Sequence, residues 1–189
     1  MSRELYGGAI SCSIPANYVD ASDLRQVPDT QEVFMAPDSD LSLIVEVLEL
    51  VKDDGAEDDL EKALRFHFSS LAHDNSALSS KVTKVDLPSA APHPQGPGLP
   101  TLQGPAIISG LQTVSKFNKP ASEADTVLIQ LALWRIPARN ADVTLSVNWP
   151  LRSGETGEEH DDAEARRVFD AAWRSFQVHD FGLFAGGSA

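Results

Sequence analysis

The clearest pattern in the chain lies in its second half, where apolar and polar residues predict a β-hairpin. An apolar run at 126–136 is followed by the turn-forming segment PARNAD at 137–142 and by a second run at 143–149. In the second run Val, Leu, Val and Trp take every other position, so one face of that strand points toward a core. The two runs are therefore predicted to pair as neighbouring strands.

Shorter patterns add five predicted strands. They lie at 9–14, 31–35, 41–50, 81–87 and 106–117. The proline at position 15 ends the first of them, because proline cannot donate a hydrogen bond to a sheet ladder. The run LSLIVEVLEL at 41–50 is apolar on both faces, so this strand needs cover on both sides of its sheet.

Two segments repeat their apolar residues at helical spacing instead. The first opens with acidic residues at 57–61 and has its apolar stripe at positions 60, 64, 67, 68 and 71. The second opens with acidic residues at 158–164 and has its stripe at positions 165, 168, 169, 172, 173 and 176. Acidic side chains are favoured at the positive start of a helix. Helix formation therefore accounts for both acidic runs without a functional role.

These elements predict an α+β fold. Strands joined by short connections favour a largely antiparallel sheet, and we expect a three-layer αβα sandwich in which the central sheet is flanked by helices on both faces. The length of 189 residues fits one domain over 1–189. Residues 88–105 hold six prolines and three glycines with almost no apolar pattern, so we expect a proline-rich surface-loop insertion there.

Composition narrows the choice of partner and compartment. The formal net charge of −13 disfavours nucleic acid and anionic membranes as partners, and favours a partner with a basic surface. The single cysteine, Cys12, excludes an intrachain disulfide. The N-terminal residues show no apolar leader and no run reaches membrane-spanning length, so we expect a protein of the nucleus and cytoplasm.

The sequence offers little for catalysis. It contains no phosphate-binding loop, zinc-ligand spacing or nucleophile elbow. Cys12 lies in an alternating strand and is interpreted as a small buried hydrophobe, and His67 lies on the apolar side of the first helix, where a packed histidine is favoured over a metal ligand. His73-Asp74 and His160-Asp161-Asp162 are adjacent in sequence and do not face each other on a helix. We therefore expect neither an enzyme nor a cofactor or metal site, with an unrecognised hydrolase as a minor alternative.

The segment DLRQVPDTQEVF at 23–34 concentrates charge around one proline. Asp20 or Ser22 is expected to cap a short helical turn, and residues 27–30 suit a type I turn with Pro28 in second position. A proline-fixed turn holds its carboxylates with little conformational freedom, and such carboxylates suit lysine or arginine on a partner. The structural alternative is that Asp29 only favours the turn while Glu32 caps it or pairs with Arg25.

The same segment belongs to a longer set of motifs. LYGGAI at 5–10, the proline at 15, DASDLRQVPDTQEVF at 20–34 and SLIVEVLEL at 42–50 closely resemble the Ran guanine-nucleotide release factors, a family of Ran-binding nuclear-transport proteins. The resemblance continues in LEKALRFHFSSLAHDN at 60–75, in the late hairpin and in the last helix, and it is weakest in the proline-rich loop.

This resemblance implies a PsbP-like αβα sandwich, a monomer that binds the small GTPase Ran, and a role in nuclear protein import through release of guanine nucleotide (GTP). By position, Asp29 and Glu32 match the acidic Ran contact, with Arg25, Gln26 and Asp23 as neighbours. The alternative is a PsbP-like structural or assembly protein that shares the fold and does not bind a GTPase.

Overall fold

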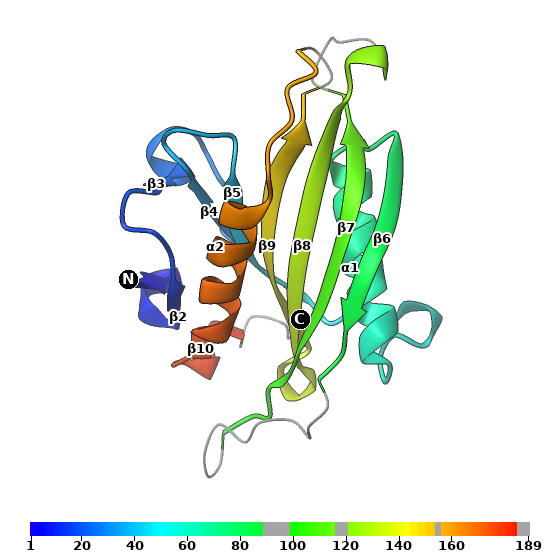
Figure 1. The fold of residues 1–189 in the computed structure, drawn as a ribbon. Helices are drawn as coiled ribbons and strands as arrows, with labels where there is room; N and C mark the ends of the chain where they lie inside the picture. The colour runs from blue at the N-terminus through cyan, green and yellow to red at the C-terminus, as the bar shows by residue number, and fades with distance from the viewer. Residues whose placement is uncertain (89–98, 116–120, 154–155, 185–189) are drawn as a thin grey trace.

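The computed structural model describes residues 1–88, 99–115, 121–153 and 156–184. Within these ranges the chain forms two antiparallel sheets and two α-helices (Figure 1). The strands of the large sheet are β3 (Val19–Asp20), β4 (Gln31–Met35), β5 (Ser42–Glu49), β6 (Ser79–Asp86), β7 (Gln103–Val114), β8 (Asp125–Ile136) and β9 (Ala141–Arg152). Their order across the sheet is β3-β4-β5-β9-β8-β7-β6.

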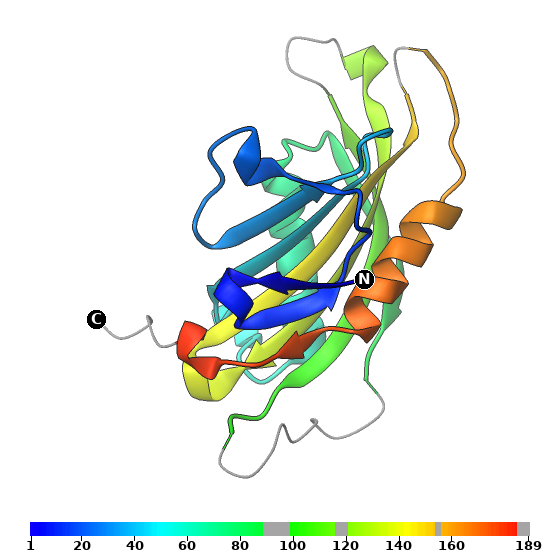
Figure 2. The same cartoon turned by 90° about the vertical axis from the view of Figure 1, so that its left-hand side faces the viewer.

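The small sheet joins the two ends of the chain. Its strands are β1 (Ser2–Leu5), β2 (Ile10–Ser13) and β10 (Gln177–Val178), in the order β1-β2-β10. Ile10 of β2 pairs with Val178 of β10, so the first and last strands of the chain lie on either side of β2 (Figure 2).

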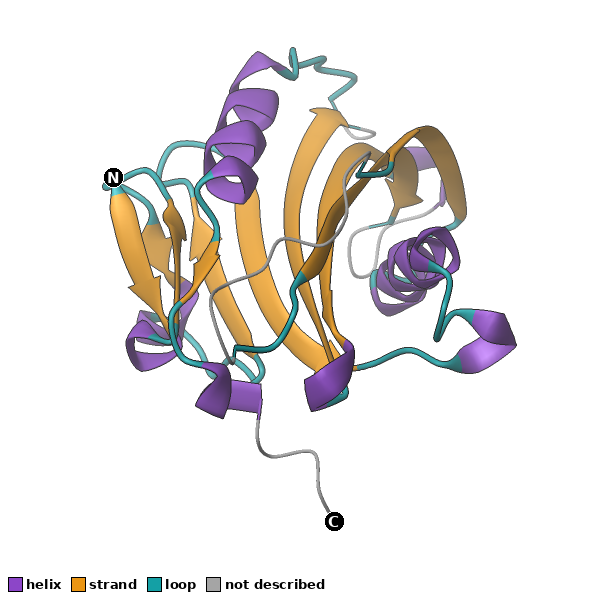
Figure 3. Cartoon of the chain, turned by 90° about the horizontal axis from the view of Figure 1, so that it is seen from below, coloured by secondary structure: helices purple, strands orange, loops and turns teal. Residues whose placement is uncertain are grey.

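The two helices are α1 (Leu60–Asp74) and α2 (Ala163–Arg174), and they lie on opposite sides of the large sheet (Figure 3). One apolar core includes Phe68 of α1 and the sheet residues Ile108 and Leu131. The other includes Phe169 of α2, residues of the small sheet and the opposite face of the large sheet. The α+β class predicted from the sequence is therefore confirmed, and the small sheet shares with α2 the cover of one face.

A buried polar network attaches α1 and the segment before it to the large sheet. Asp142 of β9 accepts from Arg135 of β8 (Nε to Oδ1, 2.8 Å), and its Oδ2 lies 2.8 Å from Nε2 of His67. The same Oδ2 accepts from the backbone N–H of Val51 (3.1 Å), and Arg135 also donates to the carbonyl oxygens of Val51, Ala56 and Glu57. The prediction that His67 packs in the core is confirmed, and its partner is a carboxylate.

Most predicted elements are present, with shifted ends. The structure adds β1, β3 and β10, which the sequence did not predict: β3 and β10 have only two residues each, and β1 (SREL) has no alternation of apolar and polar residues. The predicted loop at 88–105 is wrong at its C-terminal end, where β7 begins at Gln103 and Leu102 is buried. The ladder shifts register between Gln103 and Ala106, and this irregularity admits Pro105 into the strand. Residues 89–98 of the predicted loop lie outside the described residues.

The expectation that the strand at 41–50 is covered on both sides is confirmed on one side and only in part on the other. Leu43 and Val45 of β5 are fully buried on the α2 side. On the other side, Ile44 and Leu48 are only half-buried and line a groove beside α1, because α1 packs mainly on β7, with smaller contacts to β6 and β8.

Candidate partner-binding surface

The charged segment around Pro28 is preceded by a capped helical turn. The carboxylate of Asp20 accepts from the backbone N–H (2.9 Å) and the hydroxyl (2.7 Å) of Ser22, at the start of the short 3-10 helix η2 (Ala21–Asp23). The backbone N–H groups of Leu24 and Arg25 then donate to the carbonyl oxygen of Ala21. The predicted capping by Asp20 is confirmed, and it fixes the chain just before the proline.

The turn itself lies one residue later than predicted. The N–H of Gln31 donates to the carbonyl oxygen of Pro28 at 2.9 Å, so the hydrogen-bonded turn spans 28–31 with Pro28 in first position. Strand pairing sets this position, because Gln31 already pairs with Glu46 of β5 and the N–H of Val47 donates to the carbonyl oxygen of Thr30. We call residues 28–32 the acidic turn.

The alternation of β4 sends neighbouring side chains of the acidic turn in opposite directions. Gln31 donates to the carboxylate of Glu46 (2.7 Å) on the α1 side of the sheet. Glu32 lies on the other side, where its Oε1 accepts from the backbone N–H of Tyr6 in η1 (Tyr6–Gly8). Among the described contacts Glu32 makes no ion pair with Arg25, so this part of the structural alternative is wrong.

Asp29 and Glu32 meet at one hollow of about 340 Å³, which Tyr6, Asp20 and Pro28 also line. Asp29 is exposed and Glu32 is half-buried. Burial raises the pKa of the Glu32 carboxyl, and the nearby charge of Asp20 raises it further, while the Tyr6 N–H and Arg3 act in the opposite direction. The hollow therefore presents acceptor oxygens, and a cationic group placed there would favour the ionised form of Glu32.

The other three predicted residues are placed differently. Arg25 is exposed and lines two grooves of about 460 Å³ and about 330 Å³ that share Ile44, on the α1 side of the sheet. The ion pairs within the described residues do not include Arg25. Asp23 and Gln26 are exposed and line none of these three cavities. Asp29 and Glu32 thus line one hollow, and Arg25 lines the two grooves next to it.

Sequence reasoning missed Tyr6 as part of this surface. The local signal there is the pair of glycines that follows it, which is typical of a loop or bulge and does not indicate a contact with a partner. It also missed the exposure of Leu24, whose side chain is 67% exposed beside Arg25. A leucine in a helical turn is normally assigned to a core, so no local pattern indicates that exposure.

Cys12, the other residue considered for chemistry near this surface, does not line the hollow. Cys12 is fully buried as predicted, and burial, with a smaller effect of the Glu32 charge, raises the pKa of its thiol to about 12. Among the described residues, no three histidine, cysteine or acidic side chains gather as a set that could hold a metal ion. None of the helices in the described ranges has the length and apolarity needed to span a bilayer. His93 lies outside the described residues.

The fold is one that a crystal structure also shows. The Ran-binding protein Mog1p of Saccharomyces cerevisiae is similar with a TM-score of 0.73 and 30% sequence identity, and the match covers 98% of both chains. The two folds are therefore alike over nearly the whole length of both chains.

Sequence comparison relates the chain to the same group of proteins. The model of the family described as "Ran-interacting Mog1 protein" matches residues 3–150. The Ran guanine nucleotide release factor of Danio rerio is 32% identical over 189 residues, which cover 97% of this chain and 100% of that protein. The nuclear import protein MOG1 of Saccharomyces cerevisiae is 32% identical over 96% of this chain and 84% of its own length. The human Ran guanine nucleotide release factor is 38% identical over 77% of this chain and 74% of its own length. The chain belongs to the Ran-interacting Mog1 protein family.

Proposed function

We propose that this protein binds the small GTPase Ran and promotes release of its guanine nucleotide, in support of nuclear protein import. The observation that carries the proposal is the full-length similarity to a protein named as a Ran guanine nucleotide release factor. The protein would act as a regulator without catalysing a reaction, in the nucleus and cytoplasm. We further propose that residues 1–189 form one monomeric domain with a three-layer αβα arrangement, which the two cores on opposite faces of the large sheet support.

The proposed Ran contact is centred on Asp29 and Glu32, with Arg25, Gln26 and Asp23 as neighbours. Its support is the hollow that Asp29 and Glu32 share, in a chain with a net charge of −13. Carboxylates held in a short turn bind lysine or arginine through charge-assisted hydrogen bonds. We expect Asp29 or Glu32 to engage a basic or metal-linked group near the nucleotide phosphates in the GTPase.

Release needs no chemistry from this protein. A factor that binds nucleotide-free Ran more tightly than loaded Ran weakens nucleotide binding by the same ratio, because binding free energies are linked. A thousandfold effect requires about 4 kcal/mol of differential binding. Two or three charge-assisted contacts of about 1.5–3 kcal/mol each give about 3–9 kcal/mol, a range that includes the required value.

The decisive experiment measures release of a fluorescent guanine nucleotide from Ran, loaded with GTP or with GDP, with and without this protein. We expect accelerated release that the double variant Asp29→Asn/Glu32→Gln reduces at least about tenfold, which corresponds to about 1.4 kcal/mol of lost interaction. Glutamine keeps an oxygen that can accept from the Tyr6 N–H, so Glu32→Gln removes charge with little change in structure.

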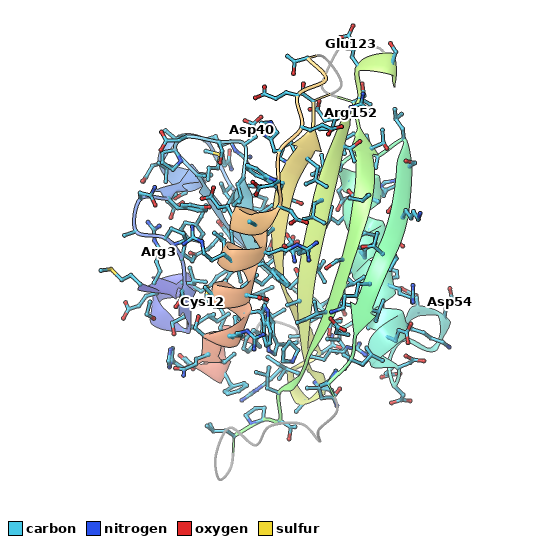
Figure 4. All side chains as sticks on the ribbon, viewed as in Figure 1. Arg3, Cys12, Asp40, Asp54, Glu123 and Arg152 are labelled. Atoms are coloured by element: carbon cyan, nitrogen blue, oxygen red, sulfur yellow. The ribbon has the colours of Figure 1, made fainter. Side chains whose placement is uncertain are left out.

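A matched control removes one charge elsewhere. Asp54 is exposed and lies on the opposite side of the molecule from Arg3 and Cys12 (Figure 4). Its backbone φ of 51° also suits asparagine, so Asp54→Asn is structurally mild. Asp54→Asn should accelerate nucleotide release from Ran as much as the wild type does. If the double variant also does so, the acidic turn is not the contact, and if the wild type neither binds Ran nor accelerates release, the proposed function fails.

A further inference from the structure

Tyr6 connects the small sheet to the acidic turn. Its hydroxyl lies 2.8 Å from the carbonyl oxygen of Thr30 and 2.9 Å from that of Val45, and its backbone N–H donates to Glu32. Val45 is the residue of β5 that pairs with Glu32. One residue of the small sheet's loop is therefore bonded to the acidic turn at two points and to the strand behind it at a third.

The hydroxyl of Tyr6 stays a donor across the physiological pH range. Burial raises the pKa of Tyr6 well above its ordinary value, and the charge of Glu32 raises it further. The single hydroxyl hydrogen is directed to two carbonyl oxygens, neither of which can donate. Loss of this hydrogen would leave the oxygen of Thr30 with its bond from the Val47 N–H alone.

The backbone of Tyr6 adopts a conformation that bulky residues rarely occupy. Its φ is 50°, in the left-handed region. The other described non-glycine residues with positive φ are Asp54, Ser76 and Asn140, which are small or polar. A bulky residue keeps such a conformation only where its surroundings hold it, and such positions are concentrated at functional sites. Here the surroundings are the contacts to Glu32, Thr30 and Val45.

The acidic turn depends on these contacts for its orientation. Asp29 is exposed, and its side chain takes part in none of the hydrogen bonds or ion pairs within the described residues. The backbone of the turn therefore sets the point from which its carboxylate projects. Thr30, the next residue, is held by Tyr6 on one side and by Val47 of β5 on the other.

We propose that Tyr6 is a positioning residue for Ran recognition, because its hydroxyl and its backbone N–H hold the acidic turn in the arrangement that presents Asp29 and Glu32 together. This inference rests on the proposed function. It assigns to the N-terminal loop a role in recognition although Tyr6 itself need not touch the partner.

The test compares two variants that each remove one tyrosine hydroxyl. Tyr6→Phe deletes the contacts to Thr30 and Val45 and keeps the ring. Tyr18→Phe is the matched control, because the Tyr18 hydroxyl is buried and has no hydrogen-bond partner among the residues that the structure describes. We expect Tyr6→Phe to bind Ran about 3- to 10-fold more weakly, the range that follows from loss of one neutral hydrogen bond, and Tyr18→Phe to bind like the wild type. Equal affinity of the two variants overturns the proposal.

A double-mutant cycle separates positioning from general destabilisation. If Tyr6 acts through the turn, Tyr6→Phe should have little further effect once Asp29→Asn has removed the carboxylate that it positions. A Tyr6→Phe effect of full size in the Asp29→Asn background would show that Tyr6 acts elsewhere, and the proposal would then be wrong.

Hydrogen exchange tests, without Ran, whether Tyr6 holds the acidic turn in place. The amide of Gln31 donates to Pro28 within the turn, and the amide of Val47 donates to Thr30 of the turn. Both amides should exchange about 3- to 10-fold faster in Tyr6→Phe and at the wild-type rate in Tyr18→Phe. If the protein does not bind Ran, the proposed function fails, and if Asp29→Asn has no effect on binding, the proposed site fails. In either case the exchange result still decides whether Tyr6 holds the turn. Unchanged exchange overturns that role as well.

Discussion

At the scale of single residues, the carboxylate of Asp142 is held by three partners. The carboxylate is fully buried and is hydrogen-bonded to the side chains of Arg135 and His67 and to the backbone N–H of Val51. Arg135 is itself 1% exposed and uses its remaining donors on backbone carbonyl oxygens. Each charge therefore depends on the other, since an unpaired charge at this depth is costly.

Asp142→Ala should lower the free energy of unfolding by about 3–5 kcal/mol, because it leaves the guanidinium of Arg135 buried without its counter-charge. Denaturant unfolding followed by tryptophan fluorescence measures this. The matched control is Asp86→Ala, which breaks an exposed pair with Lys84 and should cost no more than about 1 kcal/mol. Similar losses for the two variants would contradict the role of the network.

Glu32 should give the stability of the protein a measurable pH dependence. Its pKa is raised in the folded protein from an ordinary value of 4.5, so the folded state holds this proton more tightly than the unfolded state. The stability that Glu32 contributes is therefore full below pH 4.5 and is lost as the pH rises through the raised pKa.

Glu32→Gln should remove this dependence, and its stability relative to the wild type should increase between pH 4 and pH 7. Glu32→Ala should show the same trend with pH but lie about 1–3 kcal/mol below Glu32→Gln at both pH values, because it leaves the N–H of Tyr6 without its acceptor. Thermal unfolding at several pH values compares the three proteins. A Glu32→Gln variant that loses stability relative to the wild type on going from pH 4 to pH 7 would refute the assignment.

At the scale of elements, the approach of α1 to the large sheet depends on Gly110 of β7. A Cβ atom at this position would lie 2.5 Å from the ring of Phe68 and 2.5 Å from the carbonyl oxygen of Lys81. The helix and the edge strand β6 therefore meet over a residue without a side chain. Apolar spacing predicted the buried face of α1, but not the point of contact on the sheet.

Gly110→Ala should lower the free energy of unfolding by about 1–3 kcal/mol through overpacking against Phe68 and β6. Ser109→Ala, one position away on the opposite face, is the control and should change stability by no more than about 0.5 kcal/mol. Chemical denaturation of both variants gives the comparison. A Gly110→Ala protein as stable as the wild type would show that Phe68 and the Lys81 backbone can move apart freely.

At the scale of the whole molecule, the proline-rich region divides into two parts. Residues 89–98 carry no apolar pattern in the sequence, whereas Leu102 contributes to the core beside α2 and the small sheet. Substitutions in the two parts should therefore have different effects on the stability of the protein.

Replacement of 89–98 by a glycine-serine segment of equal length should change stability by no more than about 0.5 kcal/mol and leave Ran affinity intact. Leu102→Ala, in the same proline-rich region, should cost about 2–5 kcal/mol because its side chain is buried. Unfolding curves and a Ran pull-down measure both effects. A large loss of Ran binding in the glycine-serine variant would show that 89–98 contacts the partner.

The sequence by itself determined the elements whose side-chain spacing repeats often enough to be recognised. The β8–β9 hairpin, β4, β5 and the two amphipathic helices are within a few residues of their predicted positions. The cap by Asp20 and the buried state of Cys12 and His67 also followed from local patterns. Such properties are readable because periodicity and capping depend only on neighbours along the chain.

The tertiary structure decided the rest, because the partners lie far apart in sequence. Only the folded chain brings Tyr6 to Glu32, 26 positions away, and His67 to Asp142, 75 positions away. It also pairs β2 with β10 at the other end of the chain. Strand alternation fixes that Gln31 and Glu32 point to opposite faces, but which face meets the small sheet depends on long-range packing, and no local pattern of residues records that choice.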